Sequence, residues 1–268
     1  MFENTYLVTD KLTTFSAAEV DAAEARLETQ FPEGYREYMT AFGKGEYCSY
    51  LNVFAPQIIV QNQLGAKPPL EEFCDLWDGA EFGISPERLA KAILLASSMS
   101  RDWVVFEPGI PEAVYVLPES EDVIYKAGAT LMDALTWLCE PNWPKHRPRF
   151  RYFNSGINQK REKLSHTLRL SLDKFRNWLV ALGEYNHLEE IWDDNPGVSS
   201  EIYVLLKGRM DLVSSELGQI MAFYQSFGGY VSASVDGTGN VSAQVVHDAD
   251  KSSDTMKQIV EYLQSRAA

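Results

Sequence analysis

The sequence predicts an α+β protein built from two domains. Its 268 residues exceed the roughly 150 residues of a typical domain. Amphipathic helical patterns and short strand patterns are mixed within each half, which is typical of α+β folds. A proline-rich basic stretch separates the halves. We therefore expect an acidic first domain over 1–142, a linker over 143–163 and a smaller domain over 164–268.

Two helices joined by a proline are predicted at the start of the first domain. Ser16, with Glu19 three residues later, forms a capping-box pattern before a helix that ends ahead of Pro32. In PEGYREYMTAFGKGEY, aromatic and Met side chains recur every three or four residues, which predicts a second, shorter helix. Gly43 provides its C-terminal corner.

A mostly antiparallel sheet and a closing helix are predicted for the rest of this domain. LNVFAPQIIV is expected to be extended, WVVFEPG and AVYVLP to form two strands around a Pro-Gly turn, and VIYKAG to add another strand. ATLMDALTWLC predicts a helix with its leucines on one face.

This order of elements resembles the SUKH superfamily, the Smi/Knr-type domain, over about residues 15–140. The resemblance is carried by Phe31, Pro32, Tyr35, Tyr38, Gly43, Gly45 and the helix that begins near Thr130. One departure is Lys44, which separates two glycines that are usually adjacent in the family. The resemblance implies a protein-binding domain of the kind that bacteria encode as antidotes to polymorphic toxins, many of which are nucleases.

The net charge of −14 is confined to the first half. Residues 1–142 hold 23 acidic and 9 basic side chains, whereas residues 143–268 hold 15 of each. An acidic surface attracts basic partners and disfavours phosphate contacts, so we expect no nucleic-acid binding by this half. Three prolines, Pro141, Pro144 and Pro148, prevent the preceding helix from continuing into the linker. Seven basic residues lie from Lys145 to Lys163, and we interpret this stretch as a strap rather than a nucleic-acid-binding arm.

The second half predicts a strand-helix pair followed by further mixed elements. LSHTLRLSL alternates like a strand, and DKFRNWLVALG, with Asp173 as its cap, is predicted to be a helix. EIYVLL is expected to be a strand, DLVSSELGQIMAFYQSF a helix, YVSASVD with VSAQVV a hairpin, and SDTMKQIVEYLQSRA a final helix.

The most promising binding residues form an acidic string with interleaved aromatics, EEFCDLWDGAEFG. Aromatic anchors ringed by carboxylates suit an interface with a basic protein, although the same aromatics could simply pack on the core. The predicted toxin-binding residues are Glu71, Glu72, Asp75, Trp77, Asp78 and Glu81, with Tyr47 and Tyr50 as lesser candidates.

No catalytic residues, metal ligands or cofactor are predicted. The four histidines lack paired metal-ligand spacing, and the odd, scattered Cys48, Cys74 and Cys139 predict buried thiols. A carboxylate cluster remains open to two interpretations: it is either a solvated helix face or a set for acid-base or cation chemistry. Its members are Glu184, Glu189, Glu190, Asp193 and Asp194.

The resemblance to SUKH domains implies an immunity protein, and the acidic first half fits one that neutralises a cognate toxin with a basic surface by occlusion. We expect the protein to be cytoplasmic. No leader-like or membrane-spanning run is visible in it, so no membrane partner is expected. The alternatives are a hydrolase that acts through the C-terminal carboxylates and a regulatory protein-binding scaffold. The pattern leaves the oligomeric state open.

Overall fold

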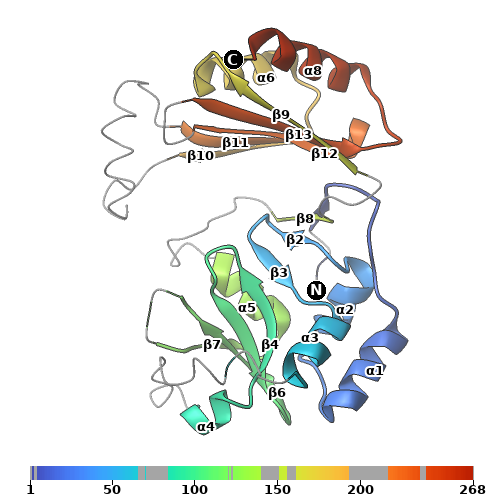
Figure 1. The fold of residues 1–268 in the computed structure, drawn as a ribbon, viewed down its shortest axis with the longest axis vertical. Coiled ribbons are helices and arrows are strands. Elements are labelled where there is room, and N and C mark those ends of the chain that lie inside the picture. The colour runs from blue at the N-terminus through green and yellow to red at the C-terminus, as the bar shows by residue number, and fades with distance from the viewer. Residues whose placement is uncertain are drawn as a thin grey trace. The chain divides into compact units, whose positions relative to one another are not determined.

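The computed structural model describes most of the chain and divides it into two compact units. The described residues are 2, 5–65, 70, 84–119, 121, 123–139, 151–155, 161–192, 217–235 and 240–267. Unit 1 comprises residues 1–7 and 12–156, and unit 2 comprises 8–11 and 157–268. Both units combine helices with a sheet, as the predicted α+β class requires (Figure 1).

Unit 1 contains an eight-stranded sheet in the order β1-β8-β2-β3-β4-β5-β6-β7. Strand β1 pairs with β8 in parallel, and the other neighbouring pairs are antiparallel. The strands are β1 (Tyr6–Leu7), β2 (Glu46–Tyr47), β3 (Leu51–Val53), β4 (Ile93–Ser98), β5 (Trp103–Glu107), β6 (Ile110–Leu117), β7 (Tyr125–Gly128) and β8 (Tyr152–Asn154). The helices are α1 (Ala17–Leu27), α2 (Tyr35–Ala41), α3 (Pro56–Gln63), α4 (Pro86–Leu89) and α5 (Leu131–Cys139).

Local capping fixes where α1 begins, as the sequence predicts. The Ser16 side chain accepts a hydrogen bond from the Glu19 backbone N–H, while the Glu19 carboxylate accepts one from the Ser16 backbone N–H. This reciprocal pair satisfies two donors that the first turn of a helix would leave unpaired. The second helix, α2, forms within the predicted stretch. It starts at Tyr35 and buries three of its side chains, those of Tyr35, Tyr38 and Met39.

Aromatic packing explains why the FPEGYREYMTAFGKGEY stretch is rich in tyrosine and phenylalanine. Tyr38 packs edge-on against Phe2 and Phe153, at ring-centroid distances of 5.5 and 5.9 Å. Phe42 contacts the same two rings, so one cluster joins α2 to β8 and to the start of the chain. The ring centroids of Phe31 and Tyr35 lie 4.4 Å apart, and Phe31 also contacts the ring of Phe106 in β5. Such contacts supply both buried area and specific geometry.

The two glycines after α2 lie where a side chain has no room. A Cβ atom at Gly43, whose φ is +72°, would lie 2.0 Å from the Thr13 carbonyl oxygen. At Gly45 it would lie 2.4 Å from the Phe153 ring. The backbone N–H of Lys44 donates to that same Thr13 carbonyl. The corner is therefore architectural, and both glycines are needed despite the intervening lysine.

Unit 2 is an antiparallel five-stranded sheet, in the order β10-β11-β12-β13-β9, with α6 and α8 on one face (Figure 1). The strands are β9 (Arg161–Leu168), β10 (His187–Trp192), β11 (Leu217–Tyr224), β12 (Gly229–Val235) and β13 (Val241–Asp248). The helices are α6 (Leu172–Leu182) and α8 (Asp254–Arg266), with a 3-10 turn, η3, at Gln225–Phe227. Phe175, Leu179, Ile259 and Leu263 from the helices pack on alternate residues of the strands.

Several sequence predictions about elements were wrong. Residues 56–63 form α3 rather than a strand, because Pro56 occupies the first helical turn, and Ile59 and Val60 are buried on one side. Residues 217–224 form β11 rather than a helix, since Ile220, Ala222 and Tyr224 alternate into the core. The helix α6 is capped by Ser171 rather than Asp173.

The division into units also differs from the predicted one in two places. The predicted linker, 143–163, contains β8, which pairs with β1 and β2 of unit 1, and the first residues of β9. Residues 8–11 belong to unit 2 rather than to the domain around them. Hydrogen bonds to partners far along the chain cause both differences.

Candidate functional site

The predicted acidic and aromatic string does not fall within the described part of the structure. Glu71, Glu72, Asp75, Trp77, Asp78 and Glu81 lie outside the described residues. Their role in binding stays a prediction.

Tyr47 and Tyr50, the two lesser candidates, are core residues of unit 1. Their exposed fractions are 1% and 4%. The Tyr50 hydroxyl donates to the Asp102 carboxylate at 2.8 Å, and Ser98 donates to the same carboxylate at 2.7 Å. Burial raises the pKa of both tyrosines to about 12. Because both side chains are buried in the core, they are not exposed to a partner at the surface of unit 1.

A surface that the sequence analysis did not single out presents carboxylates from α1, α2 and the turn between them. We call it the acidic helix pair. It holds six acidic and two basic residues over 17–41. Five of the carboxylates are exposed: Glu19, Asp21, Glu28, Glu33 and Glu37. They lie outward because Val20 and Ala23 of α1 and the tyrosines of α2 occupy the inner faces.

Internal ion pairs leave part of this negative charge uncompensated. Arg36 of α2 pairs with Asp21 and with Glu24 of α1, at 3.0 Å in the second case, and so holds the two helices together. Hydrogen bonds from the Ser16 backbone and side chain lower the pKa of Glu19, which stays ionised at neutral pH. The carboxylates of Glu28, Glu33 and Glu37 are exposed as well, so they add to the negative potential that a basic partner meets at this surface.

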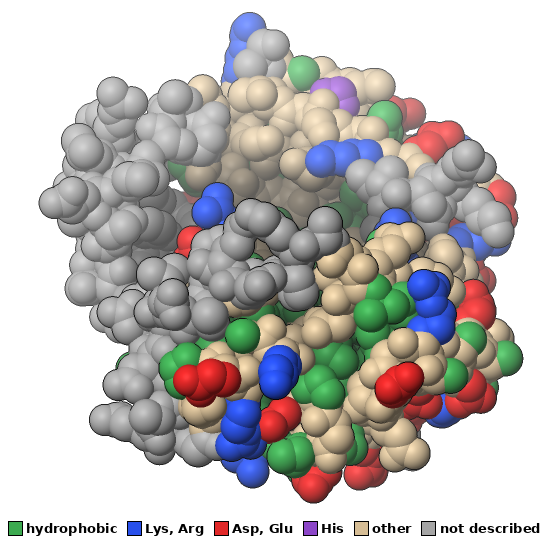
Figure 2. Space-filling model, turned by 60° about the horizontal axis from the view of Figure 1, so that its bottom comes forward, with side chains coloured by type: hydrophobic (Ala, Val, Ile, Leu, Met, Phe, Trp, Pro, Cys, Tyr) green, Lys and Arg blue, Asp and Glu red, His purple; other side chains and the backbone are tan. Residues whose placement is uncertain are grey.

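On one face of the molecule, the acidic side chains do not form a continuous patch. Figure 2 shows a face on which acidic side chains lie singly or in small groups among basic and hydrophobic ones. A protein interface commonly has this mixed character, because hydrophobic contacts supply affinity while charges set orientation and rate.

The carboxylate cluster of the second half is not assembled into a site in the described residues. Glu184 accepts a hydrogen bond from the Thr255 hydroxyl. Glu189 and Glu190 belong to strand β10 rather than to the helix that one interpretation required, and Asp193 and Asp194 lie outside the described residues. In the portion of the chain that the structure describes, no three His, Cys, Asp or Glu side chains are grouped to hold a metal ion.

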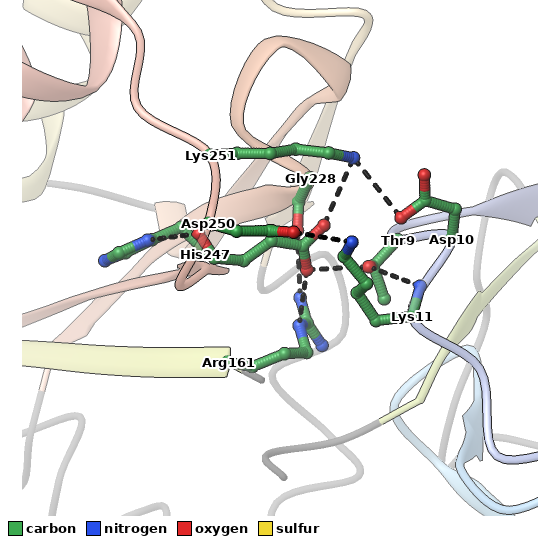
Figure 3. A network of polar contacts seen from close by, with 9 residues as sticks. Thr9, Asp10, Lys11, Arg161, Gly228, His247, Asp250 and Lys251 are labelled. Carbon is green, nitrogen blue, oxygen red and sulfur yellow. Dashed lines mark hydrogen bonds and ion pairs between the residues drawn. The ribbon is translucent and has the colours of Figure 1, made fainter. Parts of the chain in front are cut away.

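The most extensive polar arrangement is a buried ion network in unit 2 (Figure 3). Asp248, at the end of β13, accepts a hydrogen bond from the Thr9 hydroxyl at 2.7 Å. Its carboxylate lies 3.3 Å from the Arg161 Nε atom and 3.2 Å from the Lys251 Nζ atom. The side chains of Arg161 and Asp248 are completely buried.

This network holds residues 8–11 against the end of the unit 2 sheet. Lys251 also pairs with Asp10 at 3.4 Å, and Lys11 pairs with Asp250 at 2.7 Å (Figure 3). Arg161 donates to the Gly228 carbonyl at 3.2 Å, and desolvation lowers its pKa against the opposing effect of Asp248. Since cations and carboxylates are matched, the arrangement is suited to holding structure rather than to transferring protons.

Sequence reasoning missed this network for a physical reason. Thr9 and Asp248 are 239 positions apart, and neither has a distinctive neighbourhood. A local signal is the glycine pair at the start of β12, Gly228 and Gly229. A Cβ atom at Gly228 would lie 2.1 Å from the Asp248 carboxylate.

Comparisons with known proteins add no relative: no family model, curated protein or solved structure matches the chain. Among the described residues, no helix has the length and apolar character needed to cross a bilayer.

Proposed function

We propose that this chain is an immunity protein that binds a cognate bacterial toxin through unit 1 and blocks the toxin's active site or substrate surface. The observation that carries the proposal is the acidic helix pair. It presents five exposed carboxylates on a framework fixed by the Ser16 cap and the Arg36 ion pairs. The resemblance of unit 1 to SUKH domains supports the same class of function.

A basic toxin is the partner that this surface suits best. Nucleases carry Lys and Arg where they hold phosphates, so an acidic protein surface competes directly with their substrate. Rim carboxylates also accelerate association with such a partner. A hydrolase acting through the second half remains the alternative, but no specific contact among the described residues favours it.

Stoichiometry separates the two functions. If the neighbouring reading frame encodes a toxin, that toxin should be titrated with the full chain while its activity is followed. Occlusion predicts complete inhibition at about one chain per toxin, since each bound molecule blocks one active site. Complete inhibition at a small fraction of that ratio would instead indicate catalysis on the toxin or its product.

Reversing the charge of selected carboxylates tests whether the acidic helix pair is the toxin-binding surface. We expect the triple variant Glu28→Lys, Glu33→Lys, Glu37→Lys to associate with the toxin about tenfold more slowly at low salt, with a smaller difference at high salt. The control triple, Glu87→Lys, Glu112→Lys, Glu119→Lys, changes the net charge of the same unit equally. If both triples have the same rate, the acidic helix pair is not the binding surface.

A third variant tests the prediction that the acidic and aromatic string EEFCDLWDGAEFG binds the toxin. Glu71→Lys, Glu72→Lys, Asp75→Lys should be measured beside the other two triples by stopped-flow association. A larger loss of rate in this variant than in the helix-pair variant would place the interface at the string. Circular dichroism must first show that each variant is folded.

A further inference from the structure

One edge of the unit 2 sheet is formed by β9. The strand pairs with β13 along its whole length, from Arg161 opposite Asp248 to Leu168 opposite Val241. On its other side, the described residues supply a single bridge, between Leu168 and Ala267 at the end of the strand. An edge strand of this length presents backbone donors and acceptors that can pair with another strand.

A groove of about 300 Å³ runs beside this edge, between β9 and α8. From the sheet it is lined by Glu162 and Leu164 of β9 and by His247 of β13, whose Nε2 atom lies 3.6 Å from the Glu162 carboxylate. From α8 it is lined by Met256, Lys257, Val260 and Glu261. Leu164, Met256 and Val260 are half-buried, whereas the three charged side chains are exposed. The groove therefore has an apolar floor with charges at its rim.

The direction of α8 relative to β9 follows from two contacts. Met256, near the start of α8, shares the groove with Glu162, near the start of β9. Ala267, just past the end of α8, bridges Leu168 at the end of β9. The helix and the strand thus run in the same direction, and Lys257 precedes Glu261 along the groove by about one helical turn.

We propose that this edge and groove bind a second copy of the chain about a two-fold axis that passes near Leu164. In a symmetric interface the same surface must complement itself. Antiparallel pairing of β9 with its copy, centred on Leu164, places each Glu162 opposite His166 of the second copy. The same register places Lys163 opposite Ser165 rather than opposite another lysine.

Neighbouring registers are less complementary. A shift of two residues in one direction places Lys163 opposite Lys163 of the second copy, and like charges directly opposite are destabilising. The opposite shift places Glu162 against Leu168 and leaves Leu164 against His166. A shift of one residue would move every side chain to the other face of the sheet. Charge and burial together therefore select the Leu164-centred register.

The helices show the same self-complementarity. The two-fold axis makes α8 and its copy antiparallel, so Lys257 of one copy approaches Glu261 of the other at both ends of the contact. Val260 lies between these charges and Met256 just outside them, and both bury their remaining apolar surface in the dimer. Opposite charges one helical turn apart on an apolar strip are what antiparallel self-association requires.

Charge exchange across the axis provides the test. Sedimentation velocity and native mass spectrometry of the full chain should show a monomer-dimer equilibrium over about 1–200 µM. Lys257→Glu alone and Glu261→Lys alone should each weaken the dimer about tenfold, because each places like charges across the axis. The double variant should regain the dimer, as its exchanged charges are again opposite.

Mixing the two single variants gives the sharpest result. The Lys257→Glu variant carries carboxylates at both positions 257 and 261, and the Glu261→Lys variant carries ammonium groups at both. We therefore expect the mixture to contain more heterodimer than either homodimer. Gln258→Arg, at an exposed position outside the groove lining, is the control and should leave the dimer unchanged. A wild-type chain that is monomeric throughout this range, or heterodimers at no more than the statistical fraction, would overturn the proposal.

Discussion

At the scale of single residues, Asp248 has the strongest structural role in unit 2. Its buried carboxylate has the Thr9 hydroxyl, Arg161 and Lys251 around it. Removing one member of a buried ion pair leaves the other charged and desolvated, which costs more than the pair itself contributes. This carboxylate therefore links Thr9, within residues 8–11, to the last strand of the unit 2 sheet.

We expect Asp248→Ala to lower the free energy of unfolding of unit 2 by about 3–5 kcal/mol, because the Arg161 guanidinium stays buried without its carboxylate. Urea unfolding, combined with hydrogen exchange of β13 amides, measures the change. Asp250→Ala is the control, since it removes a carboxylate from the exposed pair with Lys11 and should leave the midpoint unchanged. Equal effects of the two substitutions would contradict a buried network.

Buried tyrosines make unit 1 sensitive to high pH. Burial raises the pKa of Tyr6, Tyr47 and Tyr50 to about 12, above the value of 10.0 expected in the unfolded chain. Between these values the unfolded state loses phenolic protons that the folded state keeps. Stability is therefore fully present below pH 10 and falls above it, by at most about 1.4 kcal/mol per pH unit for each tyrosine.

The measurement is a pair of titrations on the intact chain. The chain has 13 tyrosines, so the phenolate absorbance of the accessible ones should rise from about pH 10. A second, steeper rise should coincide with the loss of tertiary structure. Urea midpoints at pH 8, 10 and 11 should fall only in the last interval. A gradual phenolate titration with unchanged midpoints would show that these hydroxyls are accessible in the folded state.

At the scale of elements, local signals were sufficient where they were chemically specific. The capping box of α1, the spacing in α2 and the hairpin of β5 and β6 all formed as predicted. The failures were in apolar runs without such signals. LGQIMAFY suits a helix or a strand equally well, and its pairing with β10 and β12 decided the outcome.

The glycine corner after α2 gives a prediction at this scale. We expect Gly43→Ala to destabilise unit 1 by about 3 kcal/mol or more, since it combines a positive φ with a collision against the Thr13 backbone. Gly109→Ala is a matched control: its φ is +80° but no atom lies within 4 Å of the added Cβ. It should cost about 1–2 kcal/mol, from the backbone conformation alone.

Thermal or urea unfolding of both variants isolates the steric contribution. If the two alanine variants lose the same stability, the close approach to Thr13 is relieved at little cost. The corner would then depend only on the backbone conformation of Gly43 and not on its contact with the preceding segment.

At the scale of the whole molecule, composition predicted two domains and an acidic first half. It did not predict that unit 2 is discontinuous, because the contacts of residues 8–11 connect the beginning of the chain to its last strand. Nor could it find the acidic helix pair as a surface. That surface depends on Arg36 of α2 pairing with Asp21 and Glu24 of α1, a contact between two helices that helical periodicity does not specify.

Because unit 2 includes residues 8–11, deletions at the start of the chain should affect the two units differently. Deleting residues 1–7 removes β1, which pairs with β8, and Phe2, which packs on Tyr38 and Phe42. It leaves Thr9 and its bond to Asp248 in place. Deleting residues 1–11 removes this bond as well, together with the buried Val8 side chain.

We therefore expect the shorter deletion to destabilise unit 1 alone and the longer one to destabilise both units. Peptide-resolved hydrogen exchange reports each unit separately, through β8 for unit 1 and β13 for unit 2. The shorter deletion should accelerate exchange in β8 while β13 stays protected, whereas the longer deletion should accelerate exchange in both strands. Equal protection of β13 in the two truncated chains would mean that residues 8–11 contribute nothing to unit 2, and that Asp248 is held by Arg161 and Lys251 alone.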